Sequence, residues 1–267
     1  MRDPPRTVEA VPPSRRLADI GAEAVLIAGG GRAILLQLAN PAIGHAIARH
    51  SDFAHDPLKR LRHTLTFVYA LVYGTAAQRE RATTYVNRAH EPVVSTPGAV
   101  PSYRATDAHL QLWVAATLYD TAARVQKLLV GTLSDAELDA IYRDYAIVGT
   151  ALQVPPGLWP RDRAEFDIYW RAELARLSVD DTVLEVTRAL LHPTSGPLWL
   201  RAAMPLGRLI TAGLLPPAVR RAHELPWGPR RARRFRIAVV TMRTVNRMLP
   251  RRVREWPKDY LLARICG

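Results

Sequence analysis

Cysteine is almost absent from this sequence of 267 residues, with Cys266 as the one thiol. A single cysteine forms no disulfide within the chain and builds no metal site of several thiolates, so we expect a reducing compartment. Aromatic residues make up only 7%, whereas alanine, leucine and arginine, which favour helices, dominate. No run of about 18 apolar residues occurs, so we expect no membrane-spanning helix. The composition predicts an all-α protein.

The N-terminus lacks the apolar stretch of a signal peptide, because residues 1–16 are rich in proline and arginine. Such a segment buries too little apolar surface to fold by itself, and it predicts a flexible arm. From Leu17 onward the pattern is helical. With 48% hydrophobic residues, the chain is long enough for one large core. We therefore expect an arm over 1–16 and one helical domain over 17–267 in the cytoplasm.

Acidic residues are scarce in the last part of the chain. Residues 193–267 hold 16 Lys and Arg but only 3 Asp and Glu, which accounts for the whole net charge of +13. A basic amphipathic helix in this third would suit an anionic membrane surface. A solvated basic face with no partner explains the charge equally well. Nucleic acid is the least favoured partner, because no binding motif accompanies the arginines.

Glycine and proline punctuate the helical pattern, and no series of strands is indicated. The run Gly29-Gly30-Gly31 lacks the Lys-Ser/Thr of a phosphate loop and indicates a helix break or a close-packing point. The periodicity predicts helices over 17–27, 34–38, 43–48, 58–73, 76–90, 107–130, 135–153, from 162, and over 180–191, 196–213, 216–223, 230–248 and 257–265.

The metalloprotease, phosphate-loop, nucleophile-elbow and dinucleotide motifs are all missing. What is present is a polar cluster at the start of the helix predicted over 58–73. Arg60, His63 and Thr64 lie three and four residues apart and therefore share one face. They offer a fixed cation, an imidazole and a hydroxyl to one site. The alternative is a solvated helix start beside Asp56.

His90 is the second candidate, because it ends a predicted helix just before the proline-broken loop 91–102. A neutral imidazole is the usual protein ligand of haem iron. The alternative is a histidine that only satisfies the last carbonyls and the dipole of its helix. The remaining histidines give weaker signals. His45 and His50 lie five residues apart and share a face poorly, His55 lies in a predicted loop, and His109 lies in the first turn of a predicted helix.

Several short runs closely resemble, in order, the family of the MpaB-type oxygenases and the latex-clearing rubber oxygenases. The resemblance covers about residues 17–235. The runs are Leu36-Gln37-Leu38-Ala39-Asn40-Pro41, His50-Ser51-Asp52-Phe53, Asp56-Pro57-Leu58-Lys59-Arg60-Leu61-Arg62-His63-Thr64, Tyr73-Gly74-Thr75, Val86-Asn87-Arg88-Ala89-His90, Tyr103-Arg104-Ala105-Thr106-Asp107, Leu112-Trp113-Val114, Leu158-Trp159-Pro160, Phe166, Tyr169-Trp170 and Ala212-Gly213-Leu214-Leu215-Pro216.

The resemblance implies a helical fold around haem b. His90 matches the proximal histidine of the family, and Arg60 and Thr64 match the arginine and threonine over the haem. His63 stands where the rubber oxygenases carry a lysine that can cap the iron. A histidine there would be a sixth ligand or would hydrogen-bond dioxygen or peroxide.

Two departures from the family bear on the substrate. The family often reads Trp-Val-His-Ala-Thr, whereas this chain has Ala115 at the place of the histidine. The rubber oxygenases also use a glutamate upstream of the arginine motif, and no glutamate occurs between Ala24 and Lys59. We therefore expect a small hydrophobic substrate rather than rubber, bound among side chains such as Leu61, Phe67, Val114 and Leu118.

The sequence thus predicts a haem-b-dependent oxygenase or peroxygenase-like oxidoreductase, with Arg60, His63 and Thr64 in the distal pocket and His90 on the iron. In such an enzyme the protein positions the reactants and supplies the electrostatics. One alternative is a haem-free helical binding or scaffold protein that retains the fold. Another is a peripheral membrane protein that uses its basic C-terminal third.

Overall fold

The computed structural model describes residues 15–51 and 58–265. The regular secondary structure in this part of the chain consists of helices, without a strand. The all-α prediction is confirmed. Residues 1–14 of the predicted arm 1–16 lie outside the described residues, and Asp56 does as well. The helices are α1 Leu17–Ile20, η1 Ala24–Gly29, α2 Gly30–Leu38, α3 Pro41–His50, α4 Lys59–Tyr73, α5 Ala76–His90, α6 Ala108–Val125, η2 Gln126–Val130, α7 Asp135–Gly149, η3 Pro156–Leu158, α8 Arg163–Arg176, α9 Asp181–Leu191, α10 Leu198–Leu214, α11 Pro217–Ala222, α12 Pro229–Met248 and α13 Arg251–Ala263.

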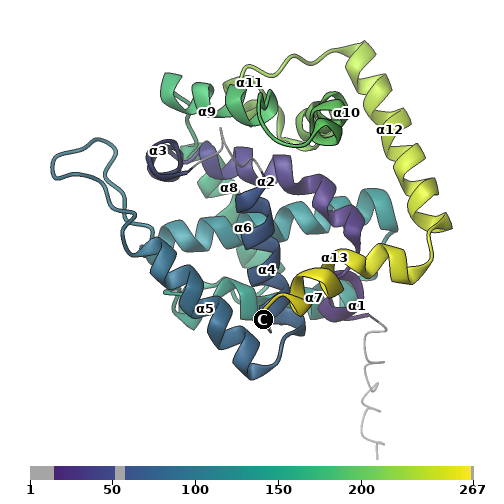
Figure 1. Cartoon of the computed structure of the whole chain (residues 1–267), viewed down its shortest axis with the longest axis horizontal. Helices are drawn as coiled ribbons and strands as arrows, with labels where there is room; N and C mark the ends of the chain where they lie inside the picture. Colours follow the sequence, from purple (N-terminus) through teal and green to yellow (C-terminus); the bar gives the residue numbers. More distant parts are fainter. Residues whose placement is uncertain (1–14, 52–57, 266–267) are drawn as a thin grey trace, which may run out of the picture.

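Two helices, α2 and α6, run through the middle of the molecule, and the others surround them (Figure 1). Leu35, Leu36 and Leu38 of α2 are fully buried, because this short helix has neighbours on every side. The indole of Trp113 on α6 donates a hydrogen bond of 3.1 Å to the carbonyl of Leu36. This contact satisfies the polar edge of a fully buried ring and fixes α6 against α2.

The segment predicted as one helix over 17–27 is divided into α1 and the 3₁₀ helix η1. The glycine run predicted as a helix break or a close-packing point lies where η1 ends at Gly29 and α2 begins at Gly30. A Cβ atom on Gly31 would lie 2.1 Å from Oγ1 of Thr211 on α10, and one on Gly29 would lie 2.4 Å from Cγ2 of Thr121 on α6. The glycines therefore let α10 and α6 approach the backbone of α2 and of the preceding 3₁₀ helix η1. The glycines are thus close-packing points at the junction of η1 and α2.

Most predicted helix limits agree with the structure, and the capping residues explain why. Thr75 and Ser134 each form a capping box at the start of α5 and α7. The segment predicted over 257–265 is wrong at its start, because α13 begins at Arg251 and continues through Pro257. The helix predicted over 135–153 ends earlier, at Gly149. The helix predicted over 107–130 becomes π-helical at Gln126.

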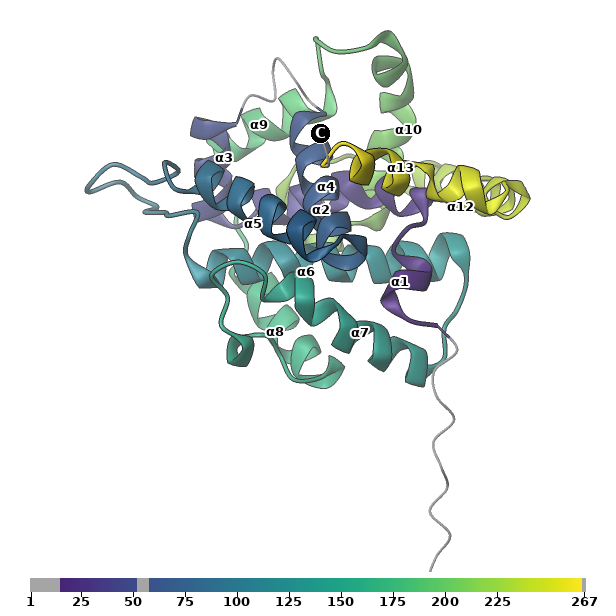
Figure 2. The same ribbon diagram turned by 60° about the horizontal axis from the view of Figure 1, so that its bottom comes forward.

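The last two long helices lie at the edge of the molecule. Helix α12 follows one side, and α13 turns back across α4 towards the start of the chain (Figure 2). The inner face of α12 packs through Phe235, Ala238 and Met242 on a small cluster around Leu129 and Ile210. Within the described residues no single helix is both long and apolar enough to cross a membrane. Only the pair Ala24–Leu38 and Pro41–His50 passes together, and it is bent by 108°.

Candidate functional site

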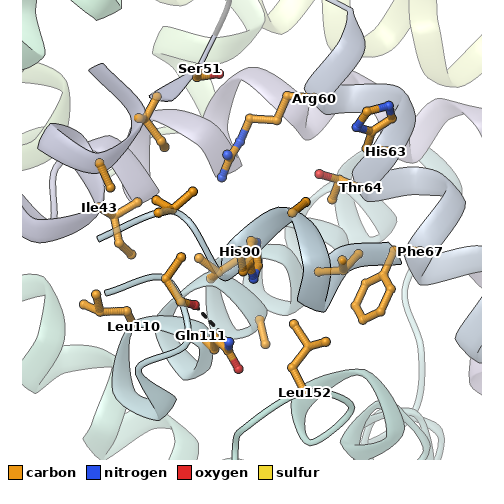
Figure 3. A pocket seen from close by; sticks show the side chains of 18 of the residues that line it. Ile43, Ser51, Arg60, His63, Thr64, Phe67, His90, Leu110, Gln111 and Leu152 are labelled. Carbon is orange, nitrogen blue, oxygen red and sulfur yellow. Dashed lines mark hydrogen bonds between the residues drawn. The ribbon is translucent and has the colours of Figure 1, made fainter. Parts of the chain in front are cut away.

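A cavity of about 370 Å³ lies between α3, α4, α5, α6 and the segment after α7 (Figure 3). This size falls within the range of cofactor and small-molecule sites. All four predicted site residues line it, namely Arg60, His63, Thr64 and His90. Of the side chains expected to hold the substrate, Phe67, Val114 and Leu118 also line the cavity, whereas Leu61 does not and packs beside Gly30.

Arg60 reaches from the first turn of α4 into the cavity, towards the side where His90 lies (Figure 3). Its Nη2 donates a hydrogen bond of 3.2 Å to Oε1 of Gln37. No carboxylate of the described residues pairs with it, and burial lowers the pKa of Arg60 to about 10. The guanidinium therefore stays charged at neutral pH and presents a positive charge to the cavity.

The orientation of Gln37 is determined by Thr117. The Thr117 hydroxyl donates to the Val114 carbonyl at 2.7 Å, so it accepts from Nε2 of Gln37 at 3.0 Å. The amide oxygen of Gln37 consequently faces Arg60. Gln37 and Thr117 are both buried. A core hydrogen-bond chain from α6 through α2 thus fixes the guanidinium of Arg60 on α4, and no local sequence pattern predicts this chain.

His90 ends α5 at the wall of the cavity. Its Nδ1 is buried and has no hydrogen-bond partner among the described residues. Burial lowers the pKa of His90, and the positive charge of Arg60 lowers it further. The imidazole is therefore neutral near pH 7 and keeps a nitrogen lone pair, as a metal ligand requires. An unpaired buried nitrogen costs free energy, and this sets His90 apart from the other residues that line the cavity.

His63 lies at the mouth of the cavity, because its side chain is exposed while it still lines the wall. The Tyr85 hydroxyl on α5 lies 3.4 Å from the ring nitrogens of His63, and the two rings meet edge to face. Thr64 is the next residue on α4 and is half-buried. The predicted polar cluster thus spans the cavity from its interior at Arg60 to its opening at His63.

His50 gives only a weak signal for a site residue in the sequence, yet it lines the same cavity. Its Nε2 lies 3.2 Å from the hydroxyl of Tyr103, which also lines the wall. Tyr103 comes from the segment between α5 and α6, which projects from the body in both views (Figures 1 and 2). Helical spacing within residues 43–50 could not reveal this pair. Only the position of His50 at the start of a family-like run marked it.

A network of side-chain amides joins three of the segments around the cavity, namely α5, α6 and the segment after α7. The Gln111 amide hydrogen-bonds the Ala105 carbonyl at 2.9 Å and also pairs with Gln153. Gln153 donates in turn to Oδ1 of Asn87 at 2.9 Å. Asn87 lies one turn before His90 on α5, so the network fixes the helix end that carries His90 to α6 and to the segment after α7.

No aspartate or glutamate of the described residues lines the cavity. Its titratable groups are Lys59, Arg60, His50, His63, His90, Tyr85 and Tyr103. In the same part of the chain, no three His, Cys, Asp or Glu side chains gather as a site for a bare metal ion. Haem needs only one axial ligand from the protein and an apolar cavity. His90 and the walls formed by Phe67, Val114 and Leu118 meet these needs, so the residues present fit haem.

Comparisons with known proteins identify the family of this chain. Residues 18–244 match the family model of the ER-bound oxygenase MpaB/B' and rubber oxygenase catalytic domain. Two relatives, described as uncharacterized proteins of Mycobacterium bovis and Mycobacterium tuberculosis, are each 37% identical over 224 residues, which cover 82% of this chain and 88% of the relative. No solved structure matches. The chain therefore belongs to the oxygenase catalytic-domain family of MpaB and the rubber oxygenases.

Proposed function

We propose that the protein is a haem-b-dependent oxygenase that oxidises a small hydrophobic substrate. The observation that carries the proposal is the pairing of two groups at one apolar cavity. His90 presents a buried nitrogen without a partner, and Arg60 presents a guanidinium without a carboxylate among the described residues. The first is a ligand for iron, and the second attracts negative charge. Haem b, when bound, would supply the chemistry of oxygen activation.

In this proposal His90 would hold the iron, and the residues opposite would control the oxidant. The positive charge of Arg60 would lie beside dioxygen or peroxide and would stabilise the negative charge that develops on its oxygen atoms. Because Gln37 already orients Arg60, little reorganisation would accompany the reaction. The Thr64 hydroxyl, four residues further along α4, would add a hydrogen-bond donor beside the same oxygen atoms.

The mouth of the cavity would control protons and access. His63, in contact with the Tyr85 hydroxyl, is exposed enough to exchange protons with solvent and lies one residue from Thr64. It would carry a proton inward or be a second residue that holds the haem iron. The apolar walls would exclude water and bind an apolar substrate by the hydrophobic effect. No carboxylate of the described residues lines the cavity, so none of these residues would serve as a base in the way of the rubber oxygenases' glutamate.

An absorption spectrum of the purified full-length protein tests the proposal. We expect a Soret band in the protein as isolated or after titration with haemin. His90→Ala should abolish that band or shift it strongly, because it removes the axial ligand. His109→Ala is the matched control, because His109 is exposed in the first turn of α6 and does not line the cavity.

A protein that stays colourless through the haemin titration would refute the proposal and leave the haem-free binding or scaffold protein as the explanation. Full retention of the Soret band in His90→Ala would refute the assignment of the ligand alone. The existence of a cofactor-sized cavity bordered by His90 supports the enzyme over the scaffold.

A further inference from the structure

Helix α12 carries seven exposed arginines without an acidic residue between them. None of the seven forms an ion pair with a carboxylate of the described residues, although ion pairs are common elsewhere in the chain. Seven like charges on one surface helix repel each other and lower its stability unless negative charge approaches from outside. The arginines are Arg230, Arg231, Arg233, Arg234, Arg236, Arg243 and Arg247.

The outward face of this helix is also apolar. Ile237 is 57% exposed and Val240 is 64% exposed. They share a face with Arg230 and Arg233, because the four positions are separated by three or four residues. Met248, two turns beyond Val240, is 79% exposed. The opposite face packs inward through Phe235, Ala238 and Met242, so the exposed aliphatic side chains have no role in holding α12 to the core.

A groove of about 240 Å³ opens between α10 and α12 beside these residues. Its walls come from both helices and are mostly aliphatic, with one arginine and one threonine. An apolar groove bordered by arginine suits the acyl chain of a lipid with an anionic headgroup. The guanidinium binds the phosphate, and the aliphatic side chains contact the methylene groups. The lining residues are Leu206, Arg234, Ile237, Ala238, Thr241 and Met242.

We infer that the outward face of α12 docks the protein on an anionic lipid bilayer. The arginines bind lipid phosphates, Ile237 and Val240 enter the acyl region, and the groove receives an acyl chain. A second copy of this chain fits less well, because two such faces would bring fourteen like charges together. Nucleic acid fits less well because its phosphates offer no partner for the exposed aliphatic side chains. The inference is independent of haem.

Vesicle flotation with the full-length protein tests this inference. We expect binding to vesicles of phosphatidylcholine with phosphatidylglycerol, and none to phosphatidylcholine alone. Arg230→Gln/Arg233→Gln should weaken binding about 30-fold, since each basic residue near the surface contributes about 1 kcal/mol. Ile237→Ser/Val240→Ser, which keeps every charge, should weaken it about 10-fold because less apolar surface is inserted.

The controls carry the same chemistry on other faces. Arg79→Gln/Arg171→Gln removes two exposed arginines from α5 and α8, and Ile168→Ser removes an aliphatic side chain that is exposed on α8. Both should bind like the unchanged protein, and circular dichroism checks that all variants are equally helical. Equal binding to neutral vesicles, no vesicle binding, or capture by duplex DNA alone would overturn the inference. The inference would also be overturned if Ile237→Ser/Val240→Ser bound anionic vesicles as well as the unchanged protein does, since this would show adsorption by charge alone.

Discussion

At the scale of single residues, the charge of Arg60 helps to keep His90 neutral. Burial disfavours the charged form of both, but the pKa of Arg60 remains at about 10, so the guanidinium keeps its proton at neutral pH. Its charge then helps to lower the pKa of His90, which stays neutral. One cation and one neutral imidazole at the same cavity follow from this difference in intrinsic pKa.

Ala115 and Ala116 are neighbours on α6 that differ in what lies beyond the methyl group. Ala115 lines the cavity, whereas Ala116 is fully buried in the core. Ala115→Leu should therefore lower the free energy of unfolding by less than about 1 kcal/mol, because the added atoms occupy the cavity. Ala116→Leu should lower it by about 2–3 kcal/mol through overpacking. Urea denaturation measures both, and equal losses would show that the space beside Ala115 does not exist in solution.

Helical spacing puts Arg60, His63 and Thr64 on one face, and a chain break places His90 at a helix end. The family resemblance then identified these four as the expected site residues, and all four line the cavity. His50 and Tyr103 escaped this reasoning. Their contact joins α3 to the segment after α5, and no spacing within one helix encodes a contact between two elements. Gln37 escaped for the same reason, because its partners lie on α4 and α6.

At the scale of elements, helix ends were predictable where a side chain caps the backbone. The prediction for α5 agrees with the structure at both ends, since Thr75 caps its start and the chain turns after His90. Helix α13 was not predictable, because Pro257 was taken as a first-turn residue while Pro250 occupies the N-cap position instead. The core packing of α13 on α4 outweighs the lost hydrogen bond at Pro257.

The contact between α2 and α10 depends on the missing side chain of Gly31. Gly31→Ala should lower the free energy of unfolding by about 2 kcal/mol, because the new methyl group would meet the buried Thr211. Thr211→Ala in the same chain should recover most of that loss, since it removes the obstructing hydroxyl. Thermal and urea unfolding of the two single variants and the double variant give the coupling energy.

Gly207 on α10 is the matched glycine. A methyl group there would meet no atom closer than Sδ of Met204 at 3.9 Å, so Gly207→Ala should stabilise the helix by about 0.5–1 kcal/mol. If Gly31→Ala stabilised the protein as Gly207→Ala does, α2 and α10 would not be in the close contact described here.

At the scale of the whole molecule, the two ends of the described chain meet at one carboxylate. Glu23, at the start of η1, accepts hydrogen bonds from Arg254 on α13 and from Asn246 near the end of α12. Glu23 and Asn246 are buried, and Nε of Arg254 is buried without a partner. The carboxylate therefore compensates a largely desolvated guanidinium more than two hundred residues away in sequence. Helix α13 is held to the core by this acidic contact and by its packing on α4.

Glu23→Gln tests how much the contact of Glu23 with Arg254 and Asn246 contributes to the free energy of unfolding. Removing the charge leaves Arg254 without compensation, so the free energy of unfolding should fall by about 2–3 kcal/mol. Hydrogen exchange should accelerate first in α13, because that helix loses its ionic contact with the N-terminal segment. Arg188→Ala breaks the pair with Glu224, in which both side chains are more than 60% exposed, and should cost at most about 0.5 kcal/mol. Equal losses in the two variants would mean that solvent screens Glu23 and Arg254 as fully as an ordinary surface pair, and that apolar packing alone keeps α13 on α4.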